Sequence, residues 1–256
     1  MPAGLDVLTL ALLAVFGLAG GIGITAVGPG GVLPTIGMFL LTGLAPPVVA
    51  GTAIATHVVT GVLGTAAYTR SGQLKDPATR RVAVLLAAAA LVATPLGVLL
   101  NTRVSGREFG SLLACAVALT GVLVLLRERR QGPGRAPATL PATRTVAMGA
   151  SVAVAAGLFG LGGPLLCVPL LVVCGTPVLA ALGAAQAQSV VIAGTGTVVY
   201  ALNGSVDWAL AAVVGVPELI GVVIGWRIAH AVPAGRLRYA LIGALLLMAP
   251  YLALHG

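Results

Sequence analysis

The glycine-rich stretch Gly28-Pro29-Gly30-Gly31 returns as Gly160-Leu161-Gly162-Gly163, at an offset of 132 residues. Seven further pairs are identical at the same offset: Gly17 and Gly149, Gly43 and Gly175, Gly51 and Gly183, Gly64 and Gly196, Thr65 and Thr197, Tyr68 and Tyr200, and Gly72 and Gly204. The chain contains 36 glycines, so the matched glycines alone carry little weight. The Thr-x-x-Tyr pattern that repeats in register among them indicates an internal duplication. Glycine breaks at matching places in two apolar halves are typical of transporters that bind their substrate between the halves.

The composition indicates a membrane protein. Hydrophobic residues make up 59% of the chain and charged residues only 8%, whereas a soluble domain carries about 25% charged residues. We therefore expect the lipid bilayer to be the solvent. The net charge of +8 does not indicate nucleic-acid binding, because the basic residues occupy short gaps between apolar runs. The 3 cysteines show no CxxC or Cys/His spacing, so no disulfide, metal site or other cofactor is expected.

Long apolar segments are expected to cross the membrane as helices at residues 5–27, 47–68, 82–100, 109–126, 145–159, 177–202, 208–228 and 237–254. Most are near the roughly 20 residues that a crossing needs. Two shorter apolar pieces, residues 32–44 and 165–175, follow the glycine clusters. Each is expected to be a half-helix or a re-entrant arm, buried where other protein covers it. The predicted fold is an all-α polytopic bundle of about eight to ten membrane segments.

Three regions divide the chain. Residues 1–126 are interpreted as a first repeat, residues 127–144 as a linker rich in Arg, Gly and Pro, and residues 145–256 as a second repeat. Five crossings per half would place twelve of the 14 Lys and Arg residues on the linker side, and four crossings would place nine there. The positive-inside rule therefore favours five crossings and a cytoplasmic linker. An odd count makes the second half an inverted copy of the first.

The order of motifs in each half resembles the TauE/SafE sulfite exporter family. These motifs are Gly-x-Gly-Gly, Gly-Thr in the next segment, Thr-x-x-Tyr and a closing glycine, at 28–31, 51–52, 65–68 and 72 and again at 160–163, 183–184, 197–200 and 204. The second half departs from the second motif, because Gly183-Ala184 stands where the first half has Gly51-Thr52. The resemblance covers nearly the whole chain. It implies transport of small sulfur-containing anions, such as sulfite or sulfonates, across a bacterial inner membrane. Gly37 stands where the family often has a proline, which the second half keeps as Pro169, and the exact anion stays open.

The glycine clusters are the first candidate binding site. A small anion that crosses a membrane must exchange its hydration for other donors, and unpaired backbone N–H groups at helix N-termini supply them. Glycine allows the backbone to approach closely and to adopt positive φ. The candidate substrate-binding glycines are Gly28, Gly30, Gly31, Gly160, Gly162 and Gly163. The alternative is that these glycines only allow close helix packing.

Polar residues in the apolar segments after the short pieces form the second candidate group. The substrate-binding candidates here are Thr52, Thr56, Gln186, Gln188 and Ser189. The offset pairs Thr56 with Gln188 and His57 with Ser189, so matching positions in both halves are polar. Hydroxyl and amide groups can donate to a sulfite or sulfonate oxygen without a strong fixed charge, which suits release as well as binding. The alternative role is hydrogen bonding between helices.

Two ionisable residues, His57 and Glu218, lie deep in predicted spans. Such groups are expensive inside a membrane and usually functional. A histidine can carry a proton near neutral pH, and Pro217 is expected to loosen the helix beside Glu218. We therefore expect one or both to couple proton movement to anion movement. A packed neutral histidine and a structural carboxyl group at a kink are the alternatives.

These features together predict a secondary transporter of a small sulfur-containing anion that works by alternating access. No Gly-x-x-x-x-Gly-Lys-Ser/Thr run indicates ATP binding. An anion channel, or a transporter of another small anion or metabolite, would use the same half-helices. An enzyme is not expected, because His57 and Glu218 stand far apart in the sequence and no HExxH motif is present. The expected partners are the anion, protons and lipid; the sequence indicates neither the transport direction nor the oligomeric state.

Overall fold

The structure is a computed structural model that describes residues 5–130 and 140–231. Helices account for most of this part of the chain. The α-helices are α1 (Val7–Ala26), α2 (Val32–Thr42), α3 (Pro46–Arg70), α4 (Pro77–Asn101), α5 (Gly106–Arg130), α6 (Ala142–Phe159), α7 (Pro164–Val173), α8 (Val178–Leu202) and α9 (Trp208–Ala231). Short 3₁₀ helices occupy Pro29–Gly31 and Gln73–Lys75. Among the described residues, 7 helices are long and apolar enough to cross a membrane, so the predicted all-helical polytopic fold is confirmed.

The helix boundaries follow the predicted segments closely. The two pieces after the glycine clusters are indeed short, with 11 residues in α2 and 10 in α7. Proline occupies the first helical position of α3, α4 and α7, where its missing N–H leaves no hydrogen bond unmade. The predicted span at residues 237–254 lies outside the described residues.

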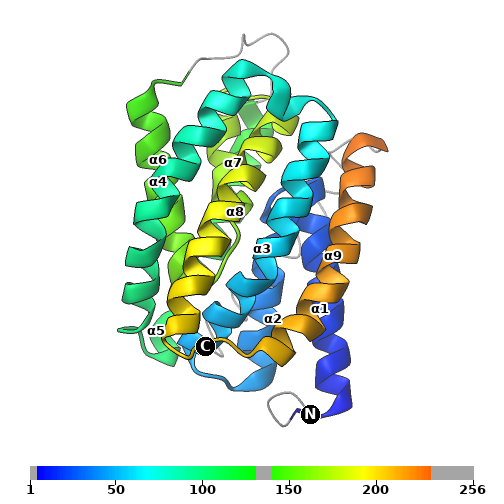
Figure 1. The fold of residues 1–256 in the computed structure, drawn as a ribbon, viewed down its shortest axis with the longest axis vertical. Coiled ribbons are helices and arrows are strands. Elements are labelled where there is room, and N and C mark those ends of the chain that lie inside the picture. The colour runs from blue at the N-terminus through cyan, green and yellow to red at the C-terminus, as the bar shows by residue number, and fades with distance from the viewer. Residues whose placement is uncertain (1–4, 131–139, 232–256) are drawn as a thin grey trace.

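Corresponding helices of the two halves run in opposite directions. In Figure 1, α1, α3 and α9 ascend from the end that holds the N-terminus, whereas α4, α6 and α8 descend. α3 and α8 begin and end at positions separated by the 132-residue offset, and they pack against each other. They are also the most buried of the long helices. In an 18-residue apolar stretch of each, 61% and 56% of the residues are buried inside the protein. The centre of the molecule is therefore built from one matched helix of each half.

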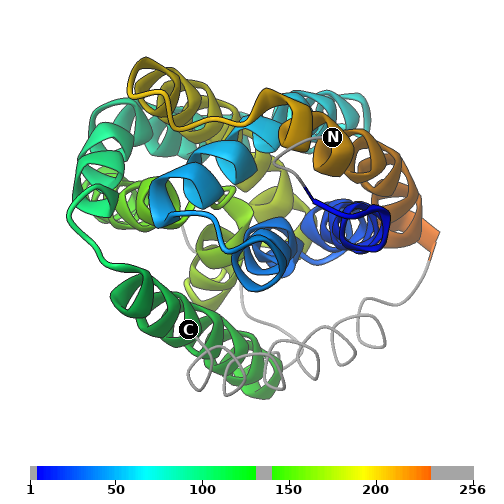
Figure 2. The same ribbon diagram turned by 90° about the horizontal axis from the view of Figure 1, so that it is seen from below.

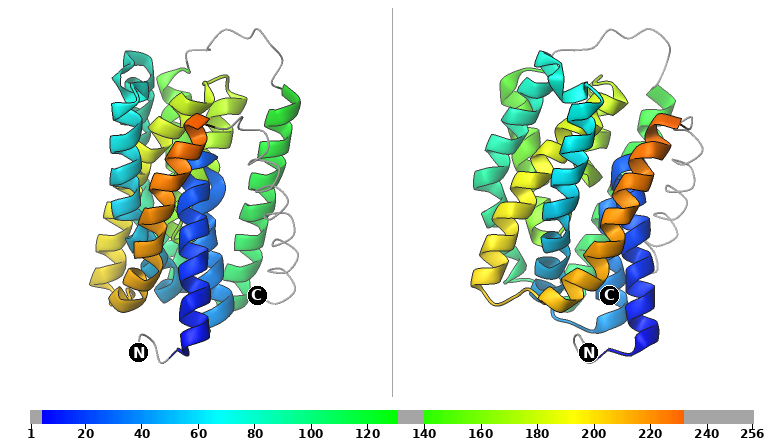
Figure 3. Two further views of the ribbon diagram at one scale, coloured as in Figure 1. Left: turned by 90° about the vertical axis from the view of Figure 1, so that its right-hand side faces the viewer. Right: turned by 45° about the vertical axis from the view of Figure 1, so that its right-hand side comes forward.

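The outer helices repeat this inverted relationship. α1 packs along α9, as Figure 3 shows, and their equivalents α6 and α4 pack along each other. Glycines make these contacts close, because a Cβ on Gly21 of α1 would overlap the Glu218 carbonyl of α9, and one on Gly97 of α4 would overlap the Val154 carbonyl of α6. The view along the bundle in Figure 2 places α5 at its edge, beside α7. Glycine therefore allows the helix backbones to approach closely at these two interfaces.

The first half carries the chain from one end of the bundle to the other. α1 ascends, α2 returns to the starting end, α3 ascends, α4 descends and α5 ascends again (Figure 1). This order has the odd number of passes that the distribution of Lys and Arg favoured. The turn between α3 and α4 therefore lies at the same end of the bundle as the end of α5 and the start of α6, which we call the linker end. Arg70, Lys75, Arg80 and Arg81 lie in or beside this turn.

Candidate functional site

Both glycine clusters form turns that end one helix and begin a short one. Gly28 has φ 107° and Gly160 has φ 69°, values in the left-handed region that glycine adopts without strain. α2 begins directly after Gly31, and α7 begins directly after Gly163. The first N–H groups of each short helix have no partner within the helix and carry partial positive charge. Each turn therefore presents the kind of backbone that binds small anions.

The two turns lie against each other's short helix. A Cβ on Gly28 would stand 3.0 Å from the side chain of Val168 in α7. In the other direction, the Thr35 hydroxyl of α2 donates to the Gly160 carbonyl at 3.4 Å. All four residues of these two contacts are buried. The mouths of the two short helices are thus brought together in the interior of the bundle.

The space between the turns is closely filled. Cβ atoms placed on Gly31 and Gly162 would stand 3.5 and 3.6 Å from the ring of His57, and 2.9 and 3.2 Å from Cδ1 of Ile24. A Cβ on Gly30 would overlap the backbone of Gly23 and Ile24. Ile24, the His57 ring and the Ser189 hydroxyl thus supply the atoms nearest to the facing glycines Gly31 and Gly162. In this conformation the candidate site is therefore closed, and an anion can enter only if side chains or helices move.

His57 and Glu218, which the sequence presented as two separate ionisable residues, form one buried pair. Nδ1 of His57 lies 2.9 Å from Oε1 of Glu218, and both side chains are 0% exposed. Nε2 of His57 lies 3.1 Å from the carbonyl oxygen of Gly31. Since that carbonyl can only accept, Nε2 carries a hydrogen and donates it. The proton between Nδ1 and the carboxyl group then belongs to either partner, so the pair holds one exchangeable proton at the mouth of α2.

Ser189 and Gln186 of α8 add polar atoms at the same place. The Ser189 hydroxyl oxygen lies 3.2 Å from where a Cβ on Gly162 would stand. A Cβ on Gly163 would stand 3.4 Å from the Ser189 backbone nitrogen, on the same turn of α8. Ser189 is fully buried and its hydroxyl has no partner among the described residues. The Gln186 amide donates to the Ile24 carbonyl at 3.2 Å, while its own oxygen is unpartnered there. Buried polar atoms without partners mark a place where a ligand can be bound.

Three other candidates have partners of their own. The Thr52 hydroxyl accepts from the backbone N–H of Asp207 at 3.0 Å, at the turn that precedes α9. The Thr56 hydroxyl donates to the Ala53 carbonyl within α3. The Gln188 amide nitrogen donates across to the Gly149 carbonyl of α6, while its oxygen, like that of Gln186, has no partner among the described residues. The structure therefore does not bring Thr52, Thr56 and Gln188 to the glycine turns. The contacts of Thr52 and Gln188 match the interhelical role that stood as the alternative, whereas the contact of Thr56 lies within α3.

Two features of the site escaped the sequence reasoning. Ile24 lies between the turns, but an apolar residue in an apolar helix gives no signal. The tyrosines of the Thr-x-x-Tyr motif were noticed without a role. Tyr68 donates to the Thr25 carbonyl at 2.6 Å, and Tyr200 donates to the Gly157 carbonyl at 2.7 Å, two contacts that the 132-residue offset relates. Each tyrosine thus ties down the helix that leads into a glycine turn.

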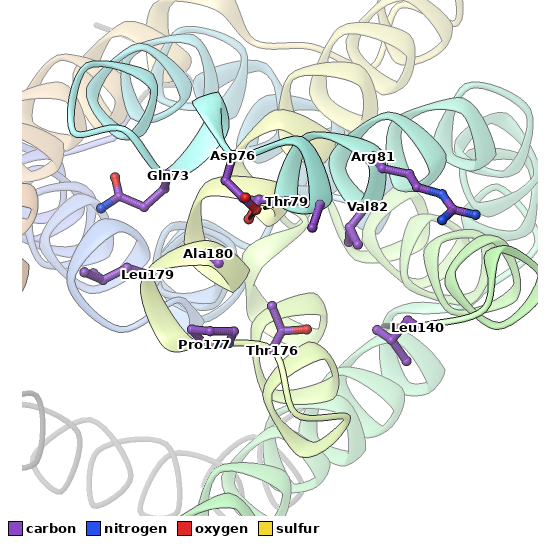
Figure 4. Close-up of a pocket in the computed structure, with 11 residues that line it drawn as sticks. Gln73, Asp76, Thr79, Arg81, Val82, Leu140, Thr176, Pro177, Leu179 and Ala180 are labelled. Carbon is purple, nitrogen blue, oxygen red and sulfur yellow. Dashed lines mark hydrogen bonds between the residues drawn. The ribbon is translucent and has the colours of Figure 1, made fainter. Parts of the chain in front are cut away.

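The two ends of the bundle differ in openness. A cavity of about 520 Å³ lies at the linker end, between the start of α4 and the turn that joins α7 to α8. Figure 4 shows Asp76 and Thr79 on one side of it and Thr176 and Pro177 on the other. The matching place at the opposite end is closed, because Gly51 packs on the Ser205 carbonyl and Thr52 binds the Asp207 backbone. Within residues 5–130 and 140–231, the linker end is therefore the more accessible one.

The comparison with known families decides the relationship that the motifs suggested. Residues 12–252 match the model of the family described as Sulfite exporter TauE/SafE. This chain belongs to the TauE/SafE family. The match spans both glycine turns, the His57–Glu218 pair and the two motif tyrosines of the TauE/SafE chain. No curated protein and no solved structure gives a significant match. Membership makes this a multi-pass membrane protein of a transporter family.

Proposed function

We propose that this TauE/SafE chain is a secondary transporter that binds a small sulfur-containing anion at the two glycine turns, works by alternating access and couples anion movement to protons. The observation that carries the proposal is the buried His57–Glu218 pair, which contacts the mouth of α2 through the Gly31 carbonyl. The N-terminal ends of both short helices and the free Ser189 hydroxyl lie at the same space. Backbone dipoles, a hydroxyl group and a protonatable ring together form a suitable environment for an oxyanion.

Proton coupling follows from the charge balance of this pair. Without an anion, the close contact of Nδ1 and Oε1 is stable with a single shared proton. An anion that binds beside this pair adds negative charge to a buried site, and this favours the uptake of a second proton by the pair. Anion and proton therefore favour each other's binding, as the reciprocity of linked sites requires. Transport of the two in the same direction is the expected consequence.

The inverted arrangement suits alternating access. We propose that residues 1–126 and 145–256 act as the two moving repeats, with the linker on the cytoplasmic side of the inner membrane. Basic residues gathered at the linker end support that orientation. Exchange of the open and closed conformations between the inverted halves would open the end that Thr52 and Asp207 now close.

Binding is the first experiment. The purified full-length protein is heated with sulfite, thiosulfate, sulfoacetate or taurine, and chloride serves as the control anion. A ligand that binds only the folded state raises the melting temperature by mass action. We expect a concentration-dependent rise with at least one sulfur anion and none with chloride. No rise with any sulfur anion would contradict the proposed substrate class.

An anion channel is the second candidate function, because half-helices with their N-termini together would also serve a pore. The closed space between the turns favours a transporter. Counterflow separates the two. Proteoliposomes loaded with unlabelled anion accumulate labelled anion transiently if the protein is a carrier, whereas a pore gives no such overshoot.

A further inference from the structure

Ile24 is the bulkiest apolar group between the two glycine turns. Its Cδ1 atom lies 2.9 Å from the Cβ position of Gly31 and 3.2 Å from that of Gly162, so one methyl group stands between the two mouths. The side chain is 0% exposed. The Gln186 amide holds the Ile24 carbonyl, and Tyr68 holds the carbonyl of the next residue, Thr25. The backbone that carries Ile24 is therefore fixed by hydrogen bonds from α8 and α3.

The matching position in the other half is small. The offset pairs Ile24 with Ala156, which lines an apolar hollow beside Gly162 together with Val152, Leu161 and Leu165. The second half therefore has no bulky side chain at the position equivalent to Ile24. At Gly31 and Gly162 the nearest atoms belong to Ile24, the Ser189 hydroxyl and the His57 ring, so Ile24 supplies the apolar contact among them.

We propose that Ile24 determines the substrate size of the transporter, an inference that rests on the proposed anion site. Its terminal methyl group occupies the volume that the carbon chain of an organic sulfonate would need. The native protein therefore selects a compact inorganic sulfur oxyanion over organosulfonates. Shortening Ile24 leaves the N–H groups, Ser189 and His57 in place and admits a carbon chain beside them.

A homologous series of ligands tests this inference. Uptake of labelled thiosulfate into proteoliposomes is inhibited by sulfite, methanesulfonate, ethanesulfonate and propanesulfonate, in wild type, Ile24→Val and Ile24→Ala. The valine variant removes only Cδ1, so it is the milder change and serves as the test if the alanine variant does not fold. Ile54→Ala is the matched control, since Ile54 is equally buried but its Cδ1 packs on Gly196, away from the turns.

We expect the inhibitory concentration of the alkyl sulfonates in wild type to rise with chain length. Relative to sulfite, that concentration should fall about tenfold or more for each methylene group admitted in the Ile24 variants. It should not change in Ile54→Ala. An unchanged ratio in both Ile24 variants, or an equal change in Ile54→Ala, overturns the inference while the anion site stands. If wild type binds none of the sulfur anions, the proposed function fails together with it.

Discussion

At the residue scale, the pairing of His57 with Glu218 is the least predictable feature. Each residue was recognisable because an ionisable group in an apolar run is costly. Nothing in the sequence places Nδ1 of one 2.9 Å from the carboxyl group of the other, because the residues lie on α3 and α9 and only the packing of the halves brings them together. The pair has no matched copy, since the offset places Ser189 and Leu86 at the equivalent positions. Among the described residues, the proposed proton site therefore occurs in one arrangement that the second half does not repeat.

Removal of one partner should destabilise the protein more than removal of both. His57→Ala or Glu218→Ala leaves a buried polar group unpaired, which costs about 3–5 kcal/mol. The double variant leaves no unpaired partner, so its loss of stability should be smaller than the sum of the two single losses. Melting temperatures of the four proteins in detergent measure this. Additive losses would show that the two residues do not act as a pair.

At the element scale, the two glycine turns are matched in sequence but differ in tolerance. A Cβ on Gly162 meets the movable ends of Ile24 and Ser189 at 3.2 Å, whereas a Cβ on Gly30 overlaps backbone. Gly162→Val should therefore insert and fold yet abolish transport, because its side chain fills the anion site. Gly30→Ala should lower the yield of folded protein. The control is Gly194→Val, where nothing lies within 4 Å of the new Cβ. Normal transport by Gly162→Val would show that the glycine turns are not part of the anion site.

The motif tyrosines should have equal structural importance. Tyr68→Phe and Tyr200→Phe each leave a buried carbonyl at the end of α1 or α6 without its donor, a loss of about 1–3 kcal/mol. We expect similar falls in melting temperature for the two variants. A large fall in melting temperature for one variant and none for the other would show that only one half needs its tyrosine hydrogen bond.

At the scale of the whole molecule, the sequence predicted the class of fold, the short helices and the opposed halves, because hydropathy and basic residues report directly on the membrane. It did not predict which polar residues face the turns. Thr52, Thr56, Gln188 and Ser189 look alike along the chain, and only packing shows that Ser189 lies beside Gly162 while the other three have partners elsewhere. The position of Ile24 between the turns could not be predicted from the sequence for the same reason.

The difference between the two ends can be measured by thiol labelling. In a background with Cys115, Cys167 and Cys174 replaced by serine, Thr176→Cys lines the cavity at the linker end and Thr52→Cys is fully buried at the closed end. Without substrate, a membrane-impermeant maleimide should label Thr176→Cys in inside-out vesicles. Thr52→Cys should stay unlabelled from either side. Labelling of Thr52→Cys in the absence of anion would show that the closed end is open at rest.

The most direct test of the central claim is thiosulfate uptake into proteoliposomes under an imposed pH gradient, with the membrane potential clamped. Thiosulfate keeps the same charge near neutral pH, so the pH gradient does not change the charge of the substrate. We expect uptake to accelerate when the outside is acidic and this acceleration to disappear in Glu218→Gln and His57→Gln. His230→Gln, a change near the end of α9, should keep it. Uptake that follows the pH gradient equally in all four proteins would contradict proton coupling through the His57–Glu218 pair.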